Sequence, residues 1–231
     1  MKVRLLRCTE NGVELVAKSA RVSGVPADMT DEEILRMIVE NDYSSALEHI
    51  SFSFDVSEIS VALSRELLEH RIASHTARST RYQEEIDFGY YIPKEFERKP
   101  EAKARYEETM RKLAETYAEL RGMGVSRESS RYLLPMAAHT NYIWTINARS
   151  LINFLGLRLC VRASPEMREL ARKVHEIAVE KYPVVFDNID CRGWNMAVCP
   201  ENKVRENTRP ACPYKKKIPT KEGIRRERAG I

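Results

Sequence analysis

The side chains best suited to chemistry gather near residue 80 of this 231-residue chain. The segment from Glu69 to Arg81 carries arginines and hydroxyl groups close together, at Arg71, Ser74, Arg78, Ser79, Thr80 and Arg81. Guanidinium groups bind phosphate through paired, charge-assisted hydrogen bonds, and hydroxyl groups can complete such a site. The chain has neither of the common glycine-rich phosphate-binding motifs. The sequence therefore predicts a phosphate site built from side chains.

A second polar group lies between Asn147 and Arg158. Arg149 and Asn153 are one helical turn apart and share a face, so a guanidinium group and an amide could contact the same ligand. Alternatively, both are ordinary surface residues of a helix. The spacing alone leaves these two interpretations open.

Local patterns in the first part of the chain indicate the elements that support these residues. Compact apolar residues predict a short strand over Lys2–Arg7, and alternating polar and apolar residues predict a strand over His49–Val56. Thr30 and Glu33 match a capping box, which predicts a helix that begins there and ends near Glu40.

A helix over Glu58–Ser74, capped by Ser57, is expected to carry the start of the arginine-rich segment. Glu66, His70 and Ser74 would then share one helical face. His70 could be a ligand-binding residue or a core histidine bonded to Glu66 one turn earlier. A histidine on an apolar helical face is more often the latter, so this residue alone decides little.

The second half of the chain is expected to be mainly helical. Apolar spacing, serine caps and proline positions predict helices over 94–122, 126–134, 148–159 and 164–181. Residues 142–146 are either a brief strand or an extended entry to the helix over 148–159. After Asp187 the periodicity stops. We therefore expect a domain over residues 1–187, followed by an extended, partly disordered basic tail over 188–231.

The composition is that of a packed globular protein, with 43% hydrophobic residues. Thirty-eight basic and 34 acidic residues leave a net charge of +4, which argues against a dedicated nucleic-acid binder but permits local basic pockets. No apolar run resembles a secretory or membrane-spanning segment, so we expect a cytoplasmic protein without membrane contact.

Five cysteines occur in the chain, and free thiols are the expected state of a cytoplasmic protein. The tail contains Cys191, Cys199 and Cys212, without a C-x-x-C pair. A disulfide and a structural metal site remain as alternatives for these three. We expect no metal in the active site.

Four stretches together resemble the signatures of the flavin-dependent thymidylate synthases. The first is the arginine-rich segment, in which His70, Arg71, Ser79, Arg81 and Tyr82 keep the family's pattern. The others are the Asn-Ala-Arg-Ser stretch 147–150 with the later Asn153 and Arg158, the turn at 45–49, and Arg131 ahead of Leu133-Leu134-Pro135. The resemblance covers roughly residues 1–187.

This resemblance implies an α/β (α+β) fold, with a mixed sheet and flanking helices in a single domain, assembled as a homotetramer. It also implies an FAD-dependent methyltransferase that converts dUMP to dTMP. Methylenetetrahydrofolate would donate the carbon, and FAD reduced by NADPH would supply the hydride.

The resemblance also implies a role for each matching residue. The FAD contacts would be Ser45, His70, Arg71, Asn147, Arg149 and Asn153. The dUMP contacts would be Glu66, Ser79, Thr80, Arg81, Arg131 and Arg158. Arg158 would also be catalytic, because a fixed cation stabilises negative charge on the pyrimidine as its C5 becomes nucleophilic.

Glu69 departs from the family, whose signature has an arginine at this position. A carboxylate beside phosphorylated ligands is repulsive unless a cation intervenes, and Arg65 or Arg78 could be that cation. Ala77 and Glu66 also differ from the residues that many family members have at these two positions. Two alternative functions remain: a non-catalytic nucleotide- or RNA-binding homologue, and a related flavoprotein acting on another pyrimidine nucleotide.

Overall fold

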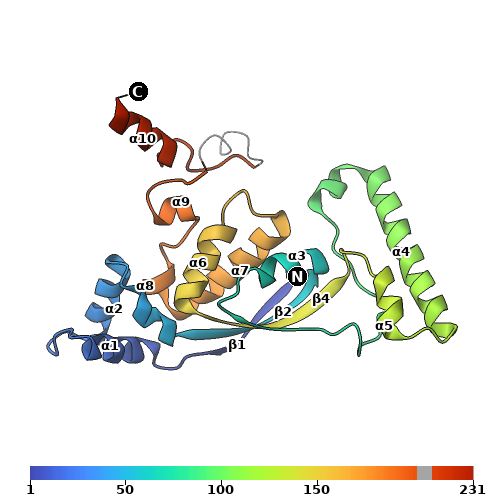
Figure 1. The fold of residues 1–231 in the computed structure, drawn as a ribbon, viewed down its shortest axis with the longest axis horizontal. Coiled ribbons are helices and arrows are strands. Elements are labelled where there is room, and N and C mark those ends of the chain that lie inside the picture. The colour runs from blue at the N-terminus through green and yellow to red at the C-terminus, as the bar shows by residue number, and fades with distance from the viewer. Residues whose placement is uncertain (202–209, 231) are drawn as a thin grey trace. The chain divides into compact units, whose positions relative to one another are not determined.

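A four-stranded sheet with flanking helices forms the framework of the protein (Figure 1). The computed structural model describes residues 1–201 and 210–230. The strands are β1 (Lys2–Cys8), β2 (Ser51–Ser60), β3 (Ser74–Ala77) and β4 (His139–Asn147), in the order β1-β2-β4-β3. The sheet is antiparallel, and the expected α/β fold class is confirmed.

The two inner strands, β2 and β4, form where buried and exposed residues alternate along the sequence. In β2, Phe52, Phe54 and Val56 are fully buried while the residues between them are partly exposed. In β4, Tyr142 and Trp144 follow the same two-residue period. A strand with one buried face has this pattern. The strand predicted over 49–56 is confirmed but begins later and ends later, at Ser51–Ser60, and the strand that is one of the two interpretations of 142–146 extends over His139–Asn147.

The chain divides into two compact units, which we describe separately. The first unit comprises Met1–Arg4 and Phe54–Trp144, and the second comprises Leu5–Ser53 and Thr145–Ile231. Strands β1, β2 and β4 each contribute residues to both units.

The helices of the first unit differ from expectation around the arginine-rich segment. Helix α3 spans Val61–Leu68, and the Ser60 hydroxyl caps it by accepting a hydrogen bond from the Leu63 N–H at 2.9 Å. The predicted helix over 58–74 with Ser57 as its cap is therefore wrong at both ends. Strand β2 continues through Ser60, and β3 pairs with β4, which removes Ser74 from the helix.

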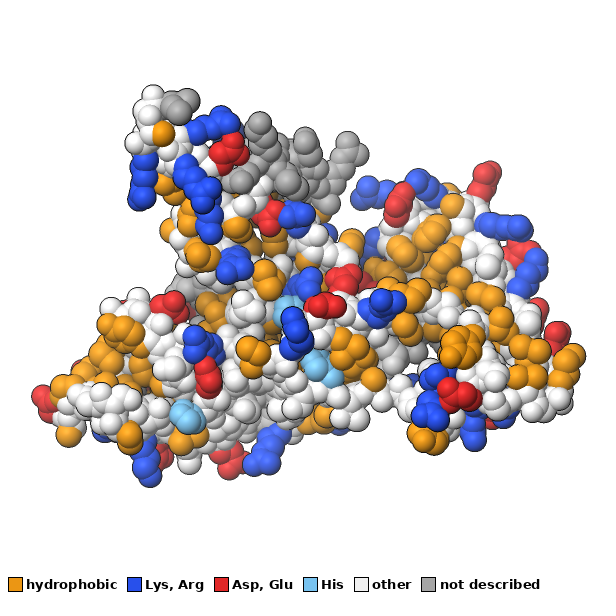
Figure 2. Space-filling model, viewed as in Figure 1, with side chains coloured by type: hydrophobic (Ala, Val, Ile, Leu, Met, Phe, Trp, Pro, Cys, Tyr) orange, Lys and Arg blue, Asp and Glu red, His pale blue; other side chains and the backbone are white. Residues whose placement is uncertain are grey.

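The charged stretch of the first unit is helical, as predicted. It forms the 3-10 helix η2 (Lys94–Arg98) and then helix α4 (Pro100–Gly122), whose first residue is a proline. Figure 2 shows basic and acidic side chains interspersed along α4, and Lys112 pairs with Glu108 at 2.6 Å. Helix α5 (Arg127–Ser130) and the 3-10 helix η3 (Arg131–Leu133) follow, so the predicted helix over 126–134 is confirmed as two short pieces.

The second unit is mainly helical. Its helices are α1 (Gly12–Val22), α2 (Asp31–Glu40), η1 (Ser44–His49), α6 (Ala148–Arg158), α7 (Pro165–Lys181), α8 (Pro183–Phe186), α9 (Arg192–Asn195) and α10 (Lys221–Ala229). The Thr30–Glu33 capping box is present, and the Ser164 hydroxyl caps α7 by accepting a hydrogen bond from the Met167 N–H, as predicted. Helix α1 was not predicted, although the spacing of Val16, Ala17 and Ala20 on its buried face is helical.

The segment after Asp187 is more ordered than expected. Helices α9 and α10 lie in it, and Cys199 and Ile218 are buried. Cys199 is held on both sides, because its N–H donates to Pro219 O at 2.8 Å and its carbonyl accepts from Lys221 N–H at 3.1 Å. An extended tail is therefore wrong for the described residues, because burial and backbone pairing fix them. Residues 202–209, also within the expected tail, lie outside the described residues.

Gly12 begins α1 where no side chain fits. A Cβ atom there would lie 2.2 Å from the Tyr182 hydroxyl oxygen and 3.0 Å from Ile50 Cγ1. That hydroxyl donates to Thr9 O at 2.6 Å, and burial raises the pKa of Tyr182 to about 12. Steric exclusion thus fixes the residue type at this position.

Substituting Gly12→Ala should destabilise the protein by about 2–4 kcal/mol, because it displaces Tyr182 and breaks its hydrogen bond. Urea denaturation monitored by circular dichroism measures this loss. Gly122→Ala is the matched control, since a Cβ at that position meets nothing within 4 Å. Equal midpoints for the two variants would contradict the prediction.

Candidate active site

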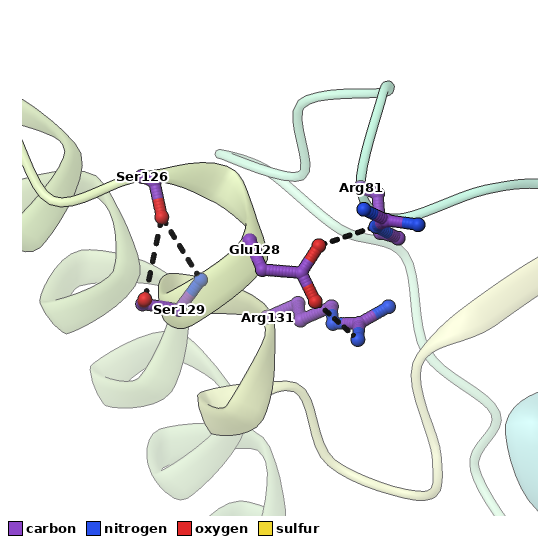
Figure 3. A network of polar contacts seen from close by, with 5 residues as sticks. All are labelled: Arg81, Ser126, Glu128, Ser129 and Arg131. Atoms are coloured by element: carbon purple, nitrogen blue, oxygen red, sulfur yellow. Dashed lines mark hydrogen bonds and ion pairs between the residues drawn. The ribbon is translucent and has the colours of Figure 1, made fainter.

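Two arginines of the first unit are joined by one carboxylate (Figure 3). Arg81, in the loop after β3, donates through Nε to Glu128 of α5. Arg131, at the start of η3, donates through Nη2 to the other oxygen of Glu128 at 2.7 Å. The structure thus brings together two arginines that are fifty residues apart in the sequence and were both predicted to bind phosphate. Glu128 itself was not predicted, although its i, i+3 spacing from Arg131 was a visible signal.

The electrostatics of this network favour an anionic ligand. Two guanidinium groups and one carboxylate leave a net charge of +1, and Glu128 raises the pKa of Arg81. Both arginines are partly exposed, and each lies near the ring of the tyrosine that follows it. The network can therefore present a preformed pair of donors to an anion in solvent.

The local backbone supports this arrangement. The Ser126 hydroxyl caps α5 by accepting from the Ser129 N–H at 3.2 Å, which orients the helix that carries Glu128. Ser79 starts the turn that carries Arg81, because its carbonyl accepts from Gln83 N–H at 2.9 Å. Ser79 and Thr80 are half-buried beside Arg81 in the chain. Their hydroxyl groups lie in the same loop as the arginine.

Arg78 has a structural role. Its Nε donates to the buried carboxylate of Glu85 at 2.6 Å, and its backbone N–H donates to Asn141 O at 2.8 Å. Within the described part of the chain, neither Arg78 nor Arg65 forms an ion pair with Glu69. The expected neutralisation of Glu69 by Arg78 is therefore wrong, because Arg78 is committed to Glu85. The exposed Arg65 forms no ion pair with Glu69 in this structure either.

The other predicted residues of the first unit lie around the end of α3. Glu66 is in its last turn, His70 follows the helix, and Arg71 is exposed. The expectation that Glu66, His70 and Ser74 share a helical face is wrong, since α3 ends at Leu68. The carbonyl of His70 instead contacts the His75 ring at 3.2 Å, so the chain turns back toward β3 here.

A second group forms where η1 meets the first turn of α6, within the second unit. The Asn147 side chain caps α6, its Oδ1 accepting from Ser150 N–H at 2.8 Å. Arg149 donates to Glu48 of η1 at 2.7 Å, and both side chains are about half exposed. Ser45 lies in the same η1 and is exposed. The structure thus places these predicted FAD contacts on two adjoining elements.

Asn153 and Arg158 lie further along α6. Asn153 is exposed one turn after Arg149, as the spacing predicted. Arg158 is the last residue of the helix, roughly 14 Å along the axis from Arg149. A single helix therefore separates the predicted catalytic arginine from the FAD-binding group at its other end.

Comparisons with known proteins identify the family to which these motifs belong. The family described as "Thymidylate synthase complementing protein" matches residues 4–184. The chain belongs to the flavin-dependent thymidylate synthase family. The flavin-dependent thymidylate synthase of Saccharolobus solfataricus is 37% identical over 80% of this chain and 75% of its own. That of Sulfolobus acidocaldarius is 32% identical over 92% and 93%, and that of Geobacter sulfurreducens is 35% identical over 87% and 91%.

Family membership decides between the functions that the sequence left open. It supports the synthase over the non-catalytic nucleotide-binding homologue and over a flavoprotein with another substrate. Among the described residues of this family member, no helix is long and apolar enough to cross a membrane.

Proposed function

We propose that the protein converts dUMP to dTMP by reductive methylation, with methylenetetrahydrofolate as carbon donor and NADPH as the source of reducing equivalents. Family membership supports the reaction class. The observation that carries the substrate assignment is the arginine pair Arg81 and Arg131, held by Glu128.

The dUMP phosphate is assigned to this pair and to the hydroxyl groups of Ser79 and Thr80. Phosphate is a dianion with several acceptor oxygens, so it suits two fixed guanidinium groups and adjacent hydroxyl donors. Glu66 is assigned to the rest of the nucleotide. Its carboxylate accepts hydrogen bonds and suits the N–H or hydroxyl groups of a nucleoside.

The residues assigned to FAD fit such a ligand chemically. The half-exposed Arg149 donates to Glu48 through Nη1, so its Nη2 is a donor that this bond does not use. Asn147 accepts its capping hydrogen bond through Oδ1, so the Nδ2 donor is not used by the cap. Cationic and amide donors suit the pyrophosphate and ring carbonyls of a flavin nucleotide. Ser45, His70, Arg71 and Asn153 complete the assigned set. Bound FAD, once reduced by NADPH, would supply the hydride for the reduction.

Arg158 is assigned the charge stabilisation in the chemical step. As C5 of the pyrimidine becomes nucleophilic, negative charge develops on the ring oxygens. A guanidinium group stays protonated throughout and therefore stabilises this charge without exchanging a proton. Arg158 would act as a fixed electrostatic group, with no need for a cysteine nucleophile.

Assembly and location complete the proposal. We assign a homotetramer in which residues of different copies meet around FAD, and a cytoplasmic location. Light scattering coupled to size-exclusion chromatography tests the assembly, and a mass of one chain would contradict it.

Tritium release from dUMP labelled at C5 tests the function. Purified protein supplied with FAD, NADPH and methylenetetrahydrofolate should release tritium and form dTMP. Omitting methylenetetrahydrofolate is the control for dTMP formation. Protein with bound FAD that forms no dTMP and releases no tritium above background would refute the proposed function.

Substituting Glu69→Arg should tighten FAD binding about 5- to 30-fold. The exposed Glu69 has no neutralising partner in Arg65 or Arg78, and the substitution exchanges a repulsive charge for an attractive one. Fluorescence titration with FAD measures this gain, which should shrink at high salt. Glu97→Arg, at an exposed residue of η2, makes the same change of net charge and should have little effect. An unchanged affinity of Glu69→Arg would contradict the prediction.

A further inference from the structure

Four of the five cysteines face one cavity in the second unit. Cys160 follows α6, Cys191 precedes α9, and Cys199 and Cys212 belong to the C-terminal segment. All four line a cavity of about 240 Å³. Their sequence positions are far apart, so the fold, and no short motif, brings the sulfur atoms to this place.

The backbone around the cavity positions these cysteines individually. Gly193 packs on Cys199 so closely that a Cβ atom would lie 3.3 Å from its Cα, so the absence of a side chain there allows the approach. The Cys191 carbonyl accepts from the Asn195 N–H at 3.1 Å, and the Cys199 N–H donates to Pro219 O at 2.8 Å. These backbone bonds hold two of the four cysteines in place beside the cavity.

The four cysteines do not form a site for a single metal ion. A zinc ion requires sulfur ligands about 2.3 Å away. Within residues 1–201 and 210–230, no three His, Cys, Asp or Glu side chains are arranged to hold one ion. All five cysteines are free thiols, so disulfides do not hold the group together either. Four cysteines around a cavity suit a thiolate-binding group that is larger than one ion. An iron–sulfur cluster is such a group, and it is commonly held by four cysteines.

The lining of the cavity fits an anionic cluster in a partly apolar site. Leu157 and Val161 line it beside the cations Arg162 and Arg192. Four thiolates on an iron–sulfur core carry net negative charge, which these arginines would offset. Prolines follow Cys199 and Cys212 directly, as a proline follows the last cysteine of the bacterial ferredoxin motif.

We propose that Cys160, Cys191, Cys199 and Cys212 bind a 4Fe–4S cluster that fastens the C-terminal segment to the end of α6. The role is structural and involves no electron transfer. The cluster links Cys160, which follows α6, to three cysteines of the C-terminal segment, and it adds to the Arg162–Glu201 ion pair that joins the same two parts of the chain.

Metal and sulfide analysis of the full chain, purified without oxygen and reconstituted with ferrous iron and sulfide, tests this proposal. We expect about four iron and about four acid-labile sulfide per chain, with a Mössbauer spectrum of a 4Fe–4S cluster. Iron and sulfide are the readouts because bound flavin also absorbs visible light. Cys212→Ser should lose most of the iron. Cys8→Ser is the matched control, because Cys8 lies in β1 outside the cavity lining, and it should keep the iron.

Limited proteolysis provides an independent measurement. The Cys212→Ser variant should be cleaved within 188–231 at least several-fold faster than Cys8→Ser, with a similar circular dichroism spectrum. Zinc at about one per chain without iron would overturn the cluster, and so would disulfides detected by intact mass. Reconstituted protein that holds neither iron nor sulfide would overturn it as well. These outcomes are separate from the tritium assay, which tests the synthase reaction itself.

Discussion

Substituting either Arg81→Ala or Arg131→Ala should weaken dUMP binding about 10- to 100-fold. A charge-assisted hydrogen bond contributes about 1.5–3 kcal/mol, and each arginine is assigned such bonds to the phosphate. The double variant should weaken binding by less than the product of the single effects. The reason is Glu128, which retains one arginine partner in each single variant and competes with the phosphate for it.

Isothermal titration with dUMP measures these losses directly. Arg127→Ala is the matched control, because Arg127 is an exposed arginine of the same helix as Glu128. It removes the same charge and should leave the affinity within about twofold. If Arg127→Ala weakened binding as much as Arg131→Ala, the effect would be one of net charge, and the assignment of the phosphate site would be wrong.

Substituting Arg158→Ala should lower kcat about 100- to 1,000-fold while KM for dUMP changes little. Removing one group that stabilises developing charge costs about 3–4 kcal/mol in the transition state. The phosphate contacts lie elsewhere, so the ground-state complex should persist. Arg158→Lys keeps the charge without the planar fork of donors and should recover part of the rate.

Tritium release separates this role from a defect in folding or flavin binding. The Arg158→Ala variant should bind FAD normally but release tritium as slowly as it forms dTMP, because the substitution affects the step at C5. Arg172→Ala removes an exposed arginine from α7 of the same unit and is the control. A rise in KM with an unchanged kcat would assign Arg158 to substrate binding alone.

The sequence predicted elements whose signals are local. The Thr30–Glu33 box and the Ser164 cap predicted the starts of α2 and α7, and the alternation of polar and apolar residues predicted β2. The end of α3 could not be predicted in this way. The residues after Leu68 are compatible with a helix, and what ends it is the pairing of β3 with β4, a contact between distant parts of the chain.

In the candidate site, too, the residues could be predicted from local motifs, whereas their contacts could not. Arg81 and Arg131 were identified from motif resemblance, but their connection through Glu128 depends on how α5 meets the loop after β3. Arg78 carries the same charge as Arg81 and lies three residues earlier, yet it pairs with Glu85. Residue type alone could not separate these two arginines, because their roles follow from which carboxylate the fold places beside each.

The cysteines illustrate why spacing rules have limits. Cys160 lies thirty-one residues before Cys191 in the sequence, so no compact motif includes it. The turn after α6 and the Gly193 contact bring it to the same cavity as the tail cysteines.

Because Glu128 bonds to both Arg81 and Arg131, a ligand that binds this pair must carry enough negative charge to compete with a carboxylate. Before a ligand binds, the Glu128 carboxylate already accepts one hydrogen bond from each guanidinium group. A metabolite with a single carboxylate offers no more than the resident group, whereas a phosphate monoester carries close to two negative charges at neutral pH. The pair would therefore select phosphate monoesters, such as nucleotides, over metabolites with a single carboxylate. Glu128→Gln should reduce this selectivity, as the site would then admit weaker anions.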